Sequence, residues 1–205
     1  MVIGLVDVPR FPEHAWSILP DLQGVLDGVI VRDKQDQAPS VWSAANKIRA
    51  TAPDLPLWIN SYLSVAVLLS AEGLALPANF VSASFIQSVW TKPIMASVHN
   101  LEDLRYHRQA DFYLWGHAFP STSKPGLRPR AWSELKRIVQ LADVPVLAIG
   151  GVSVHNIGQL AGTGIEGVCL SDGLWLESDP LEAARQIRQY VLSSDWKRSG
   201  GVQCD

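Results

Sequence analysis

The sequence predicts a (β/α)8 barrel, in which each of eight parallel strands is followed by a helix and the strands close into a ring. Eight short apolar runs recur roughly every 20 to 30 residues along the 205-residue chain. Most of these runs do not alternate between apolar and polar residues, as expected of strands that are covered on both faces. Segments with helical spacing lie between them. This is the number of strand and helix units in a compact TIM barrel.

The predicted strands are the apolar runs themselves. They cover residues 2–7, 28–32, 57–60, 73–76, 93–97, 111–115, 145–149 and 166–170. The runs Val29 to Val31 and Val146 to Ile149 are typical, since both are short and continuously apolar. An open, doubly wound sheet has the same local pattern, so the spacing alone does not show that the sheet closes.

The predicted helices follow from apolar residues at helical spacing. In 131–141, Leu135 and Ile138 share one side, and Glu134 lies on the other. The segment 181–192 repeats this pattern after Pro180, a favourable first helical residue. Shorter helices are predicted over 41–50, 61–71, 82–89, 100–108 and 154–161, whereas 12–26 is less regular because Pro20 interrupts it.

The composition is that of one globular domain. Apolar residues make up 47% of the chain and charged residues 18%. Residues 1–195 are predicted to form the domain and 196–205 a flexible tail. The net charge of -3 and the scattered basic residues argue against a nucleic-acid partner. With neither a secretion signal nor an apolar run of the roughly 18 to 20 residues that a membrane helix needs, a cytoplasmic protein without a membrane partner is predicted.

Polar residues that follow the strands are the candidate functional groups, because such barrels build their sites at the carboxyl ends of strands. His117 suits proton transfer near neutral pH, although a histidine there can equally cap backbone carbonyl groups. Arg32 and Lys34 alternate along their strand, so both point into the mouth, where they either bind a phosphate or carboxylate or form a solvated strand end. Lys124 either closes a flexible loop over a ligand or is an ordinary loop residue.

Glycine-containing turns after the last two strands predict a phosphate site. Gly150 and Gly151 let the backbone approach an anion closely, since neither has a Cβ atom. Ser171, Asp172 and Gly173 follow the eighth strand, and barrels often hold phosphate after strands seven and eight. The alternative is that these glycines only form a tight turn.

The other histidines and the tryptophans are assigned mostly to structure. The histidines have no metal-ligand spacing, so neither a metal nor a cofactor is predicted. His99 is a weaker candidate for proton transfer than His117. The histidines expected at the surface are His14, His107 and His155. Trp90 and Trp175, which lie near loops, are the tryptophans expected to line a pocket.

Several motifs together resemble the thiamine phosphate synthase/TenI superfamily. They are Gly116-His117-Ala118-Phe119-Pro120-Ser121-Thr122-Ser123-Lys124-Pro125-Gly126, Pro145 to Val152, Gly167 to Gly173, Val29 to Lys34, Ile59-Asn60 and Ala96 to His99. The likeness spans nearly the whole chain. It implies a barrel, usually a homodimer, that acts on a thiazole phosphate of thiamin biosynthesis.

Two branches of this superfamily differ in their chemistry. The synthase branch joins a pyrimidine pyrophosphate to a thiazole phosphate with Mg²⁺, and typically has Asn-Asp-Arg after strand 3 and Gly-Gln-x-Asp after strand 4. This chain has Asn60-Ser61-Tyr62 and Pro77-Ala78-Asn79-Phe80 at these places. Both carboxylates are therefore missing, and serine and phenylalanine do not replace them as Mg²⁺ ligands.

The TenI branch has a histidine directly after glycine at the end of strand 6 and Leu-Pro after strand 4. Gly116-His117 and Leu76-Pro77 match both features. The resemblance thus predicts an isomerase, a metal-independent thiazole tautomerase in which His117 moves a proton to aromatise a carboxylated dihydrothiazole phosphate. The substrate-binding residues that it implies are Arg32, Lys34, Asn60, Ser97, Lys124, Gly150, Gly151, Ser171, Asp172 and Gly173.

Three alternatives to the tautomerase stay open. The first is a synthase with a displaced metal site, and the second is a non-catalytic protein that binds a thiazole phosphate and regulates a partner. The third is another phosphorylated substrate, since the bulky Tyr62, Phe80 and Trp175 are expected near the mouth and would reshape it.

Overall fold

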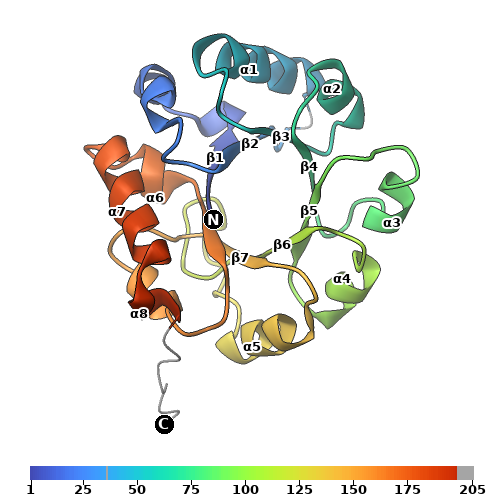
Figure 1. Ribbon diagram of the computed structural model, residues 1–205, viewed down its shortest axis with the longest axis vertical. Helices are drawn as coiled ribbons and strands as arrows, with labels where there is room; N and C mark the ends of the chain where they lie inside the picture. Colours follow the sequence, from blue (N-terminus) through green and yellow to red (C-terminus); the bar gives the residue numbers. More distant parts are fainter. Residues whose placement is uncertain (36, 198–205) are drawn as a thin grey trace.

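The strands form a closed ring in chain order (Figure 1). The computed structural model describes residues 1–35 and 37–197. Its strands are β1 (Val2–Asp7), β2 (Gly28–Arg32), β3 (Leu57–Asn60), β4 (Gly73–Leu76), β5 (Ile94–Val98), β6 (Phe112–Gly116), β7 (Val146–Ile149) and β8 (Gly167–Leu170). Each strand pairs in parallel with the next, and β8 pairs with β1. The predicted barrel is confirmed, and the open sheet is excluded.

Helices surround the ring (Figure 1). They are α1 (Ala38–Thr51), α2 (Leu63–Leu68), α3 (Ala83–Ile86), α4 (Leu101–Tyr106), α5 (Trp132–Leu141), α6 (Asp172–Trp175), α7 (Pro180–Leu192) and α8 (Ser194–Lys197). The α7 helix begins as predicted, with Pro180 in its first turn, and the side chain of Asp179 accepts a hydrogen bond from the backbone N–H of Glu182.

Two connections contain 3-10 turns instead of α-helices. The irregular first connection holds η1 (Val8–Arg10), η2 (Glu13–Ser17) and η3 (Leu19–Leu22). The helix predicted over 154–161 is wrong, since only η4 (Ile157–Leu160) forms there. Glycine is a poor α-helix former, and Gly158 lies inside this segment while Gly162 follows it with a positive φ.

Two apolar cores follow from the two-residue period of the strands. The side chains that point into the barrel are Ile3, Leu5, Ile30, Trp58, Ala75, Met95, Leu114, Leu147 and Cys169. Those that point outward pack beneath the helices. Trp58 fills the interior because Gly73 on the neighbouring strand leaves room, and a Cβ atom at Gly73 would lie 2.1 Å from the indole ring. Burial raises the pKa of the Cys169 thiol to about 12.

Three aromatic side chains expected at loops or at the surface are buried instead. Trp175 is 2% exposed and donates its indole N–H to the Leu5 carbonyl oxygen at 2.7 Å, and Trp90 is 6% exposed. Trp175 packs over Gly4, which leaves room for the ring. His107 is fully buried, with Nε2 3.1 Å from the Ala78 carbonyl oxygen. His14 and His155 are exposed, as predicted.

The C-terminal end differs from the predicted tail at its first residues. Trp196 and Lys197 belong to α8, and Trp196 donates its indole N–H to the Ile165 carbonyl oxygen at 3.0 Å. The rest of that tail, 198–205, lies outside the described residues, so the domain bounds stay a prediction. No helix in the described part of the chain is long and apolar enough to span a membrane. The cytoplasmic location and the homodimer also stay predictions.

Candidate active site

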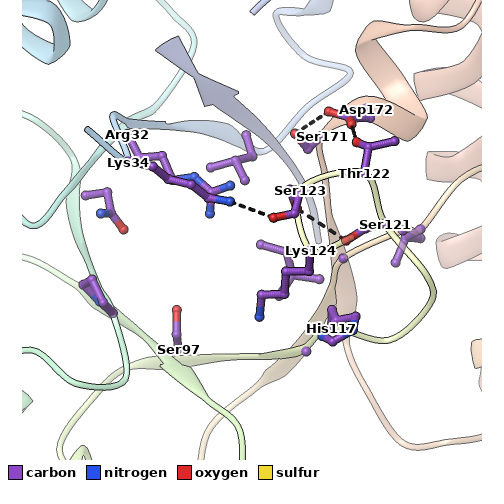
Figure 2. A pocket seen from close by; sticks show the side chains of 18 of the residues that line it. Arg32, Lys34, Ser97, His117, Ser121, Thr122, Ser123, Lys124, Ser171 and Asp172 are labelled. Atoms are coloured by element: carbon purple, nitrogen blue, oxygen red, sulfur yellow. Dashed lines mark hydrogen bonds between the residues drawn. The ribbon is translucent and has the colours of Figure 1, made fainter. Parts of the chain in front are cut away.

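The carboxyl ends of the strands enclose a cavity of about 660 Å³ (Figure 2). Its lining includes every site residue predicted from the sequence, namely Arg32, Lys34, Asn60, Ser97, His117, Lys124, Gly150, Gly151, Ser171, Asp172 and Gly173. Leu5 and Ile149, which belong to or pack on the inner core, also line the cavity. Side chains two residues apart on a strand point to the same side, and on several strands the last side chain that points into the barrel is polar. The candidate site therefore lies directly above the inner apolar core.

Arg32, Lys34 and Lys124 bring positive charge to the cavity (Figure 2). Arg32 and Lys34 come from the end of β2, and Lys124 enters from the loop that follows β6. Burial and then the Arg32 guanidinium lower the pKa of Lys34. Burial and then Arg130, Lys34 and Arg32 lower the pKa of Lys124. The charges that act on the pKa of Lys124 are all positive, and a bound anion would neutralise them.

Asp7 holds Arg32 in place beside the cavity. Arg32, Lys34 and Lys124 together form the cationic wall of the cavity. The Nη2 group of Arg32 donates to Asp7 Oδ2 at 3.0 Å, and Asp7 is 4% exposed. In the part of the chain that the structure describes, Asp7 Oδ1 and Arg32 Nε are buried and have no hydrogen-bond partner. Asp7 therefore pairs with the guanidinium of Arg32, and Lys34 and Lys124 remain as further positive charges of the cavity lining.

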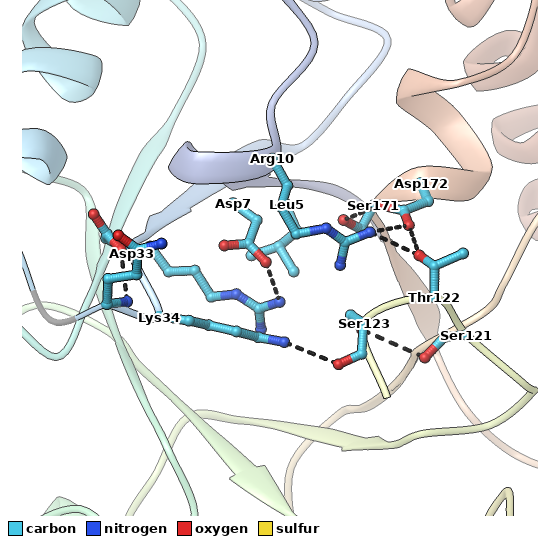
Figure 3. Close-up of polar contacts among 12 residues, drawn as sticks. Leu5, Asp7, Arg10, Asp33, Lys34, Ser121, Thr122, Ser123, Ser171 and Asp172 are labelled. Atoms are coloured by element: carbon cyan, nitrogen blue, oxygen red, sulfur yellow. Dashed lines mark hydrogen bonds and ion pairs between the residues drawn. The ribbon is translucent and has the colours of Figure 1, made fainter. Parts of the chain in front are cut away.

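The loop after β6 is tied across the mouth by polar contacts (Figure 3). Arg10 Nη2 donates to Thr122 Oγ1 at 2.7 Å and to Asp172 Oδ2 at 2.6 Å, and the Thr122 hydroxyl donates to the same carboxylate oxygen. Lys34 Nζ donates to the Ser123 carbonyl oxygen at 3.3 Å. The carboxylate of Asp172 is thus already engaged, and its charge would repel a phosphate. This geometry suits an anchor for the loop better than a phosphate ligand.

His117 and His99 form the wall at the ends of β5 and β6. His117 is 6% exposed, its Nε2 lies 3.4 Å from the Leu127 carbonyl oxygen, and its buried Nδ1 has no partner among the described residues. Burial, and then the charges of Arg130 and Lys124, lower the pKa of His99. Sequence reasoning missed Arg130, which donates to the carbonyl oxygens of Gly116 at 2.8 Å and His99 at 3.2 Å.

The glycine pair after β7 is explained by close packing as well as by backbone conformation. Gly150 and Gly151 have φ values of +96° and +69°. A Cβ atom on Gly150 would lie 2.4 Å from His117 Cβ, and one on Gly151 would lie 2.3 Å from the Pro120 carbonyl oxygen. The tight-turn interpretation therefore holds. It leaves the anion interpretation open, because the backbone N–H groups of Gly151 and Gly173 have no protein acceptor within the described ranges.

The positions where the resemblance would place magnesium ligands do not fit that ion. Asn60 Nδ2 donates to Ser61 Oγ at 2.8 Å, and Phe80 packs on the apolar core. Asp33, a carboxylate of the cavity wall, accepts hydrogen bonds from Gln35 N at 2.7 Å and from the Ser40 hydroxyl. Across 1–35 and 37–197, no three His, Cys, Asp or Glu side chains form a group that could hold an ion. Mg²⁺ requires several hard oxygen ligands, which this donor set does not provide.

Comparisons with known proteins agree on one family. Residues 17–174 match the family model described as thiamine monophosphate synthase. The thiamine-phosphate synthase of Pyrococcus abyssi is 24% identical over 187 residues, which cover 89% of this chain and 90% of that protein. The thiamine-phosphate synthase of Halalkalibacterium halodurans is 28% identical over 154 residues, which cover 72% and 73%.

Solved structures show the same fold. Thiamine phosphate pyrophosphorylase from Pyrococcus furiosus superposes with a TM-score of 0.79 and 22% identity, covering 94% of this chain and 96% of that one. The 3-hexulose-6-phosphate synthase from Salmonella typhimurium gives a TM-score of 0.71 at 15% identity, covering 93% and 98%. At these identities the likeness shows the barrel architecture alone.

The predicted tautomerase activity is wrong. The curated relatives described above, at 24% and 28% identity, are named thiamine-phosphate synthases. Gly116-His117 and Leu76-Pro77 therefore do not identify the TenI branch in this chain. The site also offers a structural reason for the glycine, since a Cβ atom at Gly116 would lie 2.2 Å from the Ile149 carbonyl oxygen. Because the family model matches well over half of its length, the chain belongs to the thiamine monophosphate synthase family of enzymes.

Proposed function

We propose that this chain is a thiamine-phosphate synthase, a transferase that joins a pyrimidine pyrophosphate to a thiazole phosphate and releases pyrophosphate. The observation that carries the proposal is the cationic wall of the cavity, where burial and neighbouring cations lower the pKa values of Lys34 and Lys124. A wall of this kind favours a substrate with several negative charges. The names of the relatives support the same reaction.

The two substrates occupy different walls of the cavity in this proposal. Arg32, Lys34 and Lys124 bind the pyrophosphate group and stabilise the negative charge that develops on it as it leaves. The unpaired backbone N–H groups of Gly151 and Gly173 bind the phosphate of the thiazole. Asn60 and Ser97, which also line the cavity, supply an amide and a hydroxyl that orient the pyrimidine.

His117 is the proton donor in the proposed reaction. The carbon–oxygen bond to pyrophosphate breaks while the carbon–nitrogen bond to the thiazole forms, and the pyrophosphate takes the bonding electron pair. His117 gives this leaving group a proton and regains one from water after product release. His117 lines the cavity, which puts its ring beside a bound leaving group.

The proposal is tested by incubating the full chain with both substrates, in parallel with EDTA and with added Mg²⁺. Thiamine phosphate and inorganic pyrophosphate are expected in equal amounts. Lys34→Met and Lys124→Met should each lower the rate by about 10²-fold, since each removes a charge that stabilises the leaving group. Lys136→Met, on the exposed side of α5, is the matched control and should keep the full rate. Absence of thiamine phosphate above background in both conditions would overturn the proposal.

A further inference from the structure

Each carboxylate around the cavity has a protein partner, although the buried Oδ1 of Asp7 has none in the described part of the chain. Asp33 accepts from the Gln35 backbone and the Ser40 hydroxyl, Asp172 is paired with Arg10, and Asp7 is paired with Arg32. A divalent cation at this site would have to displace these partners. Two of them are guanidinium groups, and releasing an arginine beside the ion would add repulsion.

Basic side chains line the cavity beside these carboxylates. Lys34 and Lys124 line the cavity. Burial, and then the charges of Arg130, Lys34 and Arg32, lower the pKa of Lys124, so the charge of Lys34 acts on Lys124. Arg130 adds to this field at Lys124, and Arg10 adds to it at Lys34. An ammonium group provides one positive charge and three N–H donors, so two of them offer the charge of one divalent ion.

The position of Lys124 is set by the loop that carries it. Its neighbour Ser123 accepts a hydrogen bond from Lys34 through its carbonyl oxygen, and Thr122 is held by Asp172 and Arg10 (Figure 3). These contacts place the ammonium group of Lys124 in the same cavity as that of Lys34. The contacts of Thr122 with Arg10 and Asp172 thus help to position the charge of Lys124. Neither Thr122 nor Asp172 has to contact the pyrophosphate for this effect.

We propose that this chain binds the pyrophosphate group of its substrate without a divalent cation, with Lys34 and Lys124 providing the charge that Mg²⁺ provides in the synthase branch. This inference rests on the proposed synthase function. It follows from the mismatch between the donor set of the cavity and the ligands that Mg²⁺ requires.

The test is calorimetric titration of inorganic pyrophosphate into the full chain at neutral pH, with EDTA and with excess MgCl₂. Binding is expected in EDTA, with no gain in affinity when Mg²⁺ is present. Lys34→Met and Lys124→Met should each weaken binding by about 10- to 100-fold, the usual effect of removing a charged hydrogen bond. Lys136→Met should bind as the parent chain does, and melting temperatures of all variants report whether they are folded.

The outcomes separate this inference from the proposed function. Affinity that requires Mg²⁺, or folded lysine variants with unchanged affinity, would overturn the inference. Thiamine phosphate formation that occurs only with Mg²⁺ would also overturn it while leaving the synthase assignment intact. Binding in EDTA without any thiamine phosphate formation would reject the synthase and retain the metal-independent pyrophosphate site.

A second variant tests the role of the loop anchor. Thr122→Val removes the hydroxyl that joins the loop after β6 to the Arg10–Asp172 pair but leaves every lysine in place. Pyrophosphate affinity in EDTA should fall by several-fold, because Lys124 is then less well positioned. The conservative Thr122→Ser should retain the parent affinity, and equal affinities for the valine and serine variants would remove the loop from the proposal.

Discussion

Lys34 and Lys124 link anion binding to proton binding at the scale of single residues. Lys124 is half-buried and Lys34 is exposed at the mouth, and for both, loss of hydration and then neighbouring cations lower the pKa in the free protein. A bound polyanion removes the repulsion and raises these pKa values again. Because only the protonated lysine binds the anion well, pyrophosphate affinity depends on the charge state of both groups.

The affinity for inorganic pyrophosphate should therefore fall as the pH rises through the lowered pKa values of the lysines, which lie below the ordinary value of 10.5. Lys124→Arg should keep its affinity to higher pH, since arginine remains protonated. Titrations of the parent and variant at matched pH between 7 and 10 check this result, and the comparison cancels the titration of pyrophosphate itself. Identical pH profiles would contradict the lysine assignment.

His117 lines the cavity, whereas the tautomerase chemistry predicted for it is wrong. Its role as a site residue stays a prediction. A second reading is that it only caps the Leu127 carbonyl oxygen, which lies 3.4 Å from Nε2. His117→Asn separates the two roles. As a proton donor, His117 should contribute about 10²-fold to kcat with little change in KM. Steady-state kinetics of thiamine phosphate formation measure both constants, and an unchanged kcat in the folded variant would favour the cap.

At the scale of the element, the loops after β6 and β7 form one packed unit. Gly150 packs against His117, and Gly151 packs against Pro120. Neither glycine leaves room for a Cβ atom. The two turns therefore fix each other, and a change in either one moves the wall that carries the histidine.

Gly150→Ala should lower the free energy of unfolding more than the same substitution does at a glycine that only needs a positive φ. It faces both a positive φ and His117 Cβ at 2.4 Å, so a loss of about 2 to 4 kcal/mol is expected. Gly24→Ala is the matched control, because Gly24 has φ +76° and no atom within 4 Å, and its loss should be about 1 kcal/mol. Urea denaturation measures both, and equal losses would show that the contact with His117 yields without cost.

The strands could be predicted almost to the residue because each one is a continuous apolar run between polar turns. The cavity lining could also be predicted, since the barrel brings all carboxyl ends to one face. The contacts of Arg10 and Arg130 could not be predicted. Arg10 meets Thr122 and Asp172 from sequence separations of 112 and 162 residues, and no local pattern records such contacts.

At the scale of the whole molecule, buried histidines make stability depend on pH. Burial lowers the pKa values of His99 and His107 from the ordinary 6.5. Below about pH 6.5 the unfolded chain thus binds more protons than the folded protein at these two sites. Their contribution to stability is complete above this pH and is lost as the pH falls toward the lowered folded-state values.

The free energy of unfolding is expected to decrease between pH 7.5 and pH 5.5. His107→Gln should make this decrease shallower, because the variant lacks one of the two titrating groups. Urea denaturation at several pH values gives both slopes. A free energy of unfolding that rises with acidification over this interval would contradict the neutral, buried state of the two histidines.

The apolar core that fills the barrel also limits which molecules the cavity accepts. Leu5 and Ile149 form the apolar part of the cavity lining, and below them the Trp58 ring fills the barrel against Gly28 and Gly73, the first residues of β2 and β4. This filled core leaves a ligand no room to extend further along the barrel axis. Selectivity should accordingly be strict for the buried end of a ligand and tolerant toward solvent, so that analogues extended at the outer end remain acceptable.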